Sequence, residues 1–373
     1  LALGTKVQAV LLIPLLAVIF AAHAGSLRAH PKAGLKTALA ALLLLFLIPA
    51  LLLNLAYLHV PLLDGHGILP PEFTTALGQK ILHAEEGHFA YLMGNYSERG
   101  WWYYFPLAIL FKTPLPVLLL LLAGLLRKPS RDALVFLLLP AAVFLAAAMR
   151  SHVNIGLRHV LMIYPLLDII AAGGASRLLL SKARLRPFGL AGPLAAGVLL
   201  AATAASAVLI APHHLSSFNL LAGGPRNGHK FLIDSNYDWG QNDKFLERHV
   251  RALAAAPKIN PDAFVPVAGR IIVNANALYG VLSGGADAYA WLKSYKPVRQ
   301  IAYTWFEYDI PPGDLPKLQA GAGPKPFAPE PVPPDQLAAA RRKYADDPDP
   351  APHLQLAVAG NDVFAASTIE LER

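Results

Sequence analysis

The stretch HAEEGHFAYLMGNYSERGWWYYFP, residues 83–106, decides how this chain is interpreted, because it joins carboxylates and histidines to a dense group of aromatic residues. It leads into the apolar run PLAILFKTPLPVLLLLLAGLL at 106–126, and another apolar run at 37–57 precedes it. Each run has about the 20 residues that a helix needs to cross the hydrocarbon core of a bilayer. The quoted stretch is therefore predicted to lie at a membrane surface, in a loop from about 60 to 105.

The composition predicts a mainly α, polytopic membrane protein. Only 15% of the residues are charged, whereas soluble globular proteins carry about a quarter. Helices are the natural spanning element, since every backbone polar group must be satisfied internally in lipid. Six spans are predicted, at 7–22, 37–57, 106–126, 133–149, 159–175 and 190–210.

The net charge of +8 is explained by how the basic residues are distributed between the loops. Three short loops are rich in cations and contain one carboxylate, Asp132, whereas the alternate loops are acidic or mixed. This alternation follows the positive-inside rule. The basic loops are therefore predicted to be cytoplasmic. The net positive charge is then explained by topology, and no nucleic-acid partner is predicted. The basic residues are Arg28, Lys32, Lys36, Arg127, Lys128, Arg131, Arg177, Lys182, Arg184 and Arg186.

The composition changes after Ile210, where polar, glycine and aromatic residues mix. The predicted transmembrane domain covers 1–212, and a small extracytoplasmic α/β or α+β domain covers 213–310. A proline-rich linker at 311–334 and a helical tail at 335–373 complete the predicted organisation.

Within 213–310 the sequence predicts two helices and two strands. Asp238 is a plausible N-cap for a helix that ends near 255. The segment DSNYDWGQN at 234–242 is interpreted mainly as turn chemistry, with substrate contact the less favoured reading. The other predicted elements are strands at 270–277 and 300–310 and a short helix at 286–294.

His83, Glu85, Glu86 and His88 are the most polar group of the long loop. Two imidazoles five residues apart do not share a helical face as the HExxH pattern of zinc enzymes does. No metal and no cofactor are therefore predicted here. Recognition of a sugar or a phosphate is preferred over a merely solvated loop.

Two basic groups flank predicted spans. Arg99 precedes the aromatic residues Trp101, Trp102, Tyr103 and Tyr104, which alone would be explained as an interfacial aromatic belt. Lys112 lies about two turns into an apolar run, where a cation either snorkels to the surface or faces a polar cavity. The second group, in the segment MRSHVNIGLRH, consists of Arg150, His152, Arg158 and His159. A phosphate-binding role is favoured for it, because the positive-inside tendency predicts few cations in an outer loop.

Four blocks of the chain resemble bacterial polyprenyl-phosphate-dependent glycosyltransferases. They are similar to the protein O-mannosyltransferase and aminoarabinose transferase superfamily, which is glycosyltransferase family 39-like and has the GT-C fold. The blocks are EEGHFAYLMGNYSERGWWYYFPLAILFKTPLPVLLLLL (85–122), GLRHVLMIYPLL (156–167), FNLLAGGPRNGHKFLIDSNYDWGQN (218–242) and YAWLKSYKPVRQIAYTWFEYDI (289–310).

The resemblance implies a GT-C-like helix bundle that transfers a sugar from a polyprenyl-phosphate carrier to an acceptor on the outer face of the bacterial inner membrane. The acceptor is a lipid, a glycan or a protein, and membrane lipids surround the bundle. The catalytic aspartate of the family lies in the first outer loop, so it is expected upstream of Leu1, in an N-terminal part that this chain lacks. The alternative is a non-catalytic transporter or scaffold subunit that retains the fold.

The expected substrate-binding residues come from both polar segments. Arg99, Lys112, Arg150 and Arg158 are expected to line a cavity and to contact the carrier phosphate, and the neighbouring aromatic residues to hold the first isoprene units. The full set is His83, Glu85, Glu86, His88, Tyr91, Arg99, Trp101, Trp102, Tyr103, Lys112, Arg150, His152, Arg158 and His159.

Overall fold

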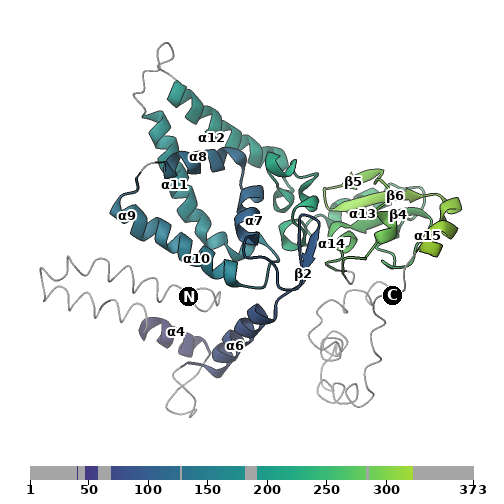
Figure 1. The fold of residues 1–373 in the computed structure, drawn as a ribbon, viewed down its shortest axis with the longest axis horizontal. Helices are drawn as coiled ribbons and strands as arrows, with labels where there is room; N and C mark the ends of the chain where they lie inside the picture. The colour runs from purple at the N-terminus through teal and green to yellow at the C-terminus, as the bar shows by residue number, and fades with distance from the viewer. Residues whose placement is uncertain are drawn as a thin grey trace, which may run out of the picture. The chain divides into compact units, whose positions relative to one another are not determined.

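The computed structural model describes residues 40, 47–57, 69–126, 128–180, 191–282 and 285–321. The chain divides into two compact units, Leu1–Tyr237 and Asp238–Arg373 (Figure 1). The domain boundary expected between 212 and 213 therefore falls inside the first unit.

The first unit is mainly helical. Its helices are α4 (Ile48–Ala56), α6 (Pro71–Glu86), α7 (Tyr104–Lys112), α8 (Leu115–Leu125), α9 (Arg131–Ala133), η3 (a π-helix, Leu134–Leu138), α10 (Leu139–Arg150), α11 (Tyr164–Leu179) and α12 (Ala191–Ile210). Short 3₁₀ turns link them, namely η4 (Leu157–His159), η5 (Leu161–Ile163), η6 (His214–Ser216), η7 (Leu220–Ala222), η8 (Gly228–Lys230) and η9 (Asp234–Asn236). Strands β1 (Ala90–Leu92) and β2 (Asn95–Ser97) form an antiparallel hairpin.

Among the described residues, three helical segments are each long and apolar enough to cross a membrane: Arg131–Arg150, Leu161–Leu179 and Gly192–Ile210. They coincide with the last three predicted spans, so the prediction of a mainly helical chain with helices apolar enough to span a membrane is confirmed. The predicted span at 7–22 and most of the one at 37–57 lie outside the described residues.

The span predicted at 106–126 is not one continuous helix. Helices α7 and α8 are bent by 115° at a short break, and together they are long and apolar enough to cross a membrane. Pro114 causes the break, because it has no N–H to continue the helix and disfavours helical geometry at Thr113. Thr113 indeed has extended backbone angles. Beyond the break, α8 packs against α11 and α12 (Figure 1).

Hydrogen bonds explain why the segment 214–236 belongs to the first unit. The Ser235 hydroxyl donates to the Ile155 carbonyl at 2.7 Å, and the Leu157 N–H donates to the Asn236 side chain at 2.8 Å. Gly156 packs so closely on Ser235 that an added Cβ would lie 2.1 Å from its Oγ. These contacts join segments that lie far apart in the sequence, so the sequence of each segment alone does not indicate them.

The second unit contains a four-stranded mixed sheet in the order β3-β4-β6-β5. Only the pairing of β3 with β4 is parallel. Helix α13 (Asp243–Arg251) covers one face, where Leu246 packs with Ile272, Ile301 and Trp305. The strands are β3 (Lys258–Ile259), β4 (Gly269–Asn274), β5 (Arg299–Ile301) and β6 (Trp305–Ile310).

Several predicted elements of this unit are corrected. The helix expected from Asp238 to about 255 is α13, and Asp238 is instead buried and accepts a hydrogen bond from the Asn274 side chain at 2.5 Å. The strand expected at 300–310 is the hairpin β5–β6. The strand expected at 270–277 is β4 followed by the short helix α14 (Ala275–Leu278), and the helix expected at 286–294 is the 3₁₀ turn η10 (Ala290–Leu292). The linker expected from 311 contains η11 (Pro312–Asp314) and α15 (Leu315–Gly321). The predicted tail at 335–373 lies outside the described residues.

Candidate functional site

A pocket of about 480 Å³ brings the two predicted basic groups of the first unit together. One wall is the segment 99–102, just before α7, and the other is 149–152, at the end of α10. Five of the residues expected to bind substrate line it: Arg99, Trp101, Trp102, Arg150 and His152. Gly100, Met149 and Ser151 complete the lining.

Asn154 joins the two walls of the pocket by hydrogen bonds. Its side-chain oxygen accepts the Trp101 N–H at 2.6 Å, and its amide group donates to the Ser151 carbonyl at 3.3 Å. Gly100 has a φ of +61°, and a Cβ there would lie 2.0 Å from the Asn154 side-chain oxygen. Asn154 is buried, and nothing in the sequence pattern marked it or Gly100 as part of the site.

The chemistry of the pocket suits an anion that carries an apolar group. Two exposed arginines, Arg99 and Arg150, supply forked N–H donors that match phosphate oxygens. Trp101 and Trp102 supply broad apolar rings, and Tyr103 meets Trp102 edge to face at 5.5 Å. The described residues that line the pocket include no carboxylate, so the local charge favours a negatively charged ligand.

A second polar group lies around Asp234, which has a φ of +61°. Burial raises the pKa of its carboxyl, while the Ser235 N–H and the charges of His88 and Arg158 act in the opposite direction. His88 and Arg158 were expected at the site, but Asp234 was interpreted mainly as a turn residue, with substrate contact the less favoured reading. Three distant segments of the chain bring these groups together, so local sequence could not reveal the cluster.

Lys112 is placed differently from the expectation. Its ammonium donates to the carbonyls of Leu215 at 2.5 Å and Asn236 at 2.6 Å, and it lies 4.4 Å from the centre of the Phe218 ring. Lys112 does not line the pocket that contains Arg99 and Arg150. The Lys112 ammonium neither snorkels nor faces that pocket, because the carbonyls of Leu215 and Asn236 accept its hydrogen bonds.

Tyr91 and His159 do not line the pocket. The Tyr91 hydroxyl donates to the Lys230 carbonyl at 3.0 Å, and the ring of His159 lies 6.3 Å from that of Phe105. His83, Glu85 and Glu86 belong to α6, and their side chains lie outside the described part of the structure.

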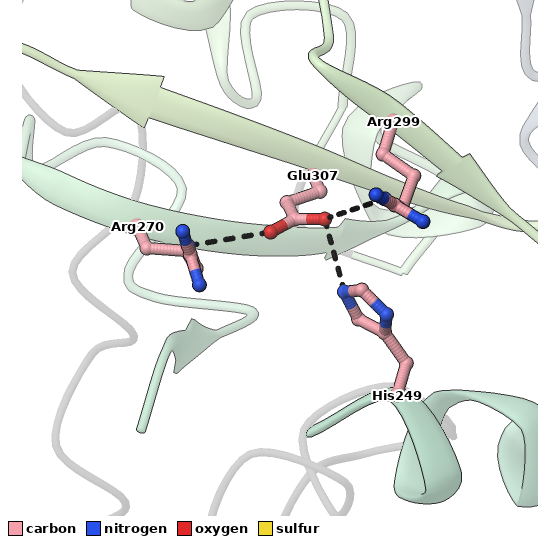
Figure 2. Close-up of polar contacts among 4 residues, drawn as sticks. All are labelled: His249, Arg270, Arg299 and Glu307. Carbon is pink, nitrogen blue, oxygen red and sulfur yellow. Dashed lines mark hydrogen bonds and ion pairs between the residues drawn. The ribbon is translucent and has the colours of Figure 1, made fainter. Parts of the chain in front are cut away.

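The second unit contains a separate charged cluster around Glu307 of β6 (Figure 2). The Glu307 carboxylate is buried and contacts His249 Nε2 at 3.0 Å, Arg270 Nε at 3.3 Å and Arg299 Nε at 3.6 Å. His249 comes from α13, and the arginines come from the neighbouring strands β4 and β5. Because one carboxylate contacts side chains from α13, β4 and β5, the arrangement is suited to joining α13 to the sheet.

Among the residues that the structure describes, no group of His, Asp or Glu side chains is arranged to hold a metal ion. Comparisons with protein families, with curated proteins and with solved structures found no match to this chain.

Proposed function

We propose that this chain binds the lipid carrier of a membrane glycosyltransferase. It takes a sugar from a polyprenyl-phosphate donor, and the acceptor lies on the outer face of the bacterial inner membrane. The observation that carries the proposal is the pocket that unites Arg99 and Arg150 with Trp101 and Trp102 at the end of a helix able to span a membrane. The GT-C-like blocks of the sequence support the same conclusion.

Each residue of the pocket has a role in this proposal. Arg99 and Arg150 bind the carrier phosphate, and the indoles of Trp101 and Trp102 hold the first isoprene units. In the reaction the acceptor oxygen forms a bond to the anomeric carbon, and the bond between that carbon and the phosphate oxygen breaks. The two guanidinium groups stabilise the negative charge that develops on the leaving phosphate. The general base is not assigned to any residue of this chain.

Substitution of the arginines tests the phosphate site. Arg99→Ala and Arg150→Ala are each expected to weaken binding of a radiolabelled polyprenyl-phosphate sugar by about tenfold in proteoliposomes. A hydrogen bond to a charged group contributes about 1.5–3 kcal/mol, and the lower end applies because both side chains are exposed. Arg251→Ala is the matched control, since Arg251 is an exposed arginine of α13. Unchanged binding in both pocket variants would exclude the assignment.

The donor is identified in the same preparation by competition. Polyprenyl phosphates that carry different sugars, and the sugar-free polyprenyl phosphate, compete with the labelled donor. Preference for one sugar identifies the donor, and equal competition by the sugar-free lipid shows that only the phosphate and the isoprenes are recognised. In the complete protein, binding without release of polyprenyl phosphate would favour the non-catalytic alternative.

A further inference from the structure

The 3₁₀ turn η7 presents two leucines to the surroundings. Leu220 is 79% exposed and Leu221 is 49% exposed. The turn follows α12, a helix able to span a membrane, whose last turn exposes Val208 and Leu209 in the same way. Exposed apolar side chains therefore occur again in η7, beyond the end of the helix and an intervening segment in which His214 is exposed.

Asn219 attaches η7 to the break between α7 and α8. In an unbroken helix the Leu110 carbonyl would accept the N–H of residue 114, but Pro114 has none. The Asn219 amide supplies the missing donor, at 2.5 Å from the Leu110 carbonyl and 2.8 Å from that of Thr113. The Asn219 N–H donates to the Phe111 carbonyl at 2.9 Å. The turn therefore lies beside the middle of the apolar α7–α8 pair.

The backbone of η7 is suited to a medium without water. The Leu221 N–H donates to the Asn219 side-chain oxygen at 3.0 Å, and the Ala222 and Gly224 N–H groups donate to the Asn219 carbonyl at 3.2 and 2.9 Å. The Gly223 N–H donates to the Leu220 carbonyl at 3.0 Å. An unsatisfied backbone group costs several kcal/mol in the bilayer core, and four successive donors of this turn are satisfied within it.

We infer that η7 is inserted into the acyl-chain region of the bilayer, on the side of the membrane at which α12 ends. Leu220 and Leu221 are then in contact with lipid. Lipid is the partner because the turn is attached to the break of a helix pair that together is long and apolar enough to cross a membrane, and Leu220 and Leu221 are exposed beside that break. The inference does not depend on carrier binding. It differs from the prediction that the domain at 213–310 is extracytoplasmic throughout.

Site-directed spin labelling tests the insertion, and the chain has no cysteine that would have to be removed. Leu220→Cys and Leu221→Cys are each labelled with a nitroxide in the full chain, reconstituted in vesicles of phosphatidylethanolamine and phosphatidylglycerol. Collisions with oxygen, which concentrates among acyl chains, are compared with collisions with a water-soluble nickel chelate. Both positions are expected to be accessible to oxygen and less accessible to nickel than a position exposed to water.

Two matched labels calibrate the result. Leu122→Cys, at an exposed position of α8, reports the lipid environment, and Val298→Cys, at an exposed position of the second unit, reports water. Nickel accessibility at Leu220 and Leu221 equal to that at Val298 would overturn the inference. If the label at Leu122 were also accessible to nickel, both the inference and the assignment of α8 to the membrane would be wrong. All four substituted side chains are exposed, so folding is preserved, and gel filtration in detergent verifies it.

Discussion

At the scale of single residues, Glu307 illustrates how one buried carboxylate can contact two arginines and a histidine at once. Its two oxygens are divided between Arg270 on one side and Arg299 and His249 on the other (Figure 2). The arginine side chains are partly exposed, so solvent screens part of each interaction. The carboxylate itself is almost fully buried, and removal of its charge leaves its partners without an anion.

We predict that Glu307→Gln destabilises the second unit by about 1–3 kcal/mol, the usual cost of leaving buried polar partners unsatisfied. The amide keeps the shape of the side chain but loses its charge. Hydrogen exchange of peptides that cover β4, β5 and β6 measures the effect, and exchange there is expected to be faster. Glu247→Gln is the control, because Glu247 pairs with Arg251 at an exposed site, where a pair contributes about 0–1 kcal/mol. Equal exchange in the two variants would contradict the prediction.

At the scale of elements, α8 and α11 approach so closely that their glycines decide the contact. A Cβ on Gly174 would lie 2.0 Å from the Leu120 carbonyl oxygen and 2.8 Å from the Gly124 nitrogen. Both are backbone atoms and cannot move aside as a flexible side chain could. The neighbouring Gly173 has no such contact within 4 Å. Small residues at helix crossings are how membrane helices reach close packing.

Gly174→Ala is therefore expected to lower the melting temperature of the detergent-solubilised chain, because an extra methyl group in a packed contact costs about 1–3 kcal/mol. Gly173→Ala provides an internal comparison on the same helix. It introduces the same methyl group without a clash, and removal of a helical glycine stabilises by up to about 1 kcal/mol. A melting temperature for Gly174→Ala at or above that for Gly173→Ala would show that the two helices separate at no cost.

At the scale of the whole molecule, the alternation of basic and acidic loops predicts the orientation. A reporter that is active only in the cytoplasm is expected to be silent when fused after Arg373. The same reporter fused after Arg184, in a predicted cytoplasmic loop, is expected to be active. The physical reason is that cations resist translocation, so basic loops stay inside. Cytoplasmic activity at Arg373 would reverse the orientation and move the pocket to the other face.

Apolar length was enough to predict a mainly helical first unit with helices apolar enough to span a membrane, because burial in lipid demands long helices. Three of the predicted spans, at 133–149, 159–175 and 190–210, appear as helices of sufficient length and apolarity. Pro114 could have indicated the bend between α7 and α8. Strands β4 and β6 also followed from the β-branched and aromatic residues at 270–277 and 300–310, although β3 and the hairpin between β5 and β6 did not.

The tertiary structure decided which polar residues meet. Arg99 and Arg150 share a pocket because Asn154 joins their segments, whereas Lys112 is satisfied by the carbonyls of Leu215 and Asn236. Local patterns determined the composition of each segment, its hydrophobic length and its charge, since those depend on neighbours in the chain. Contacts between residues separated by tens of positions depend on packing, so only the folded chain distinguishes a ligand-facing cation from one that holds the backbone together.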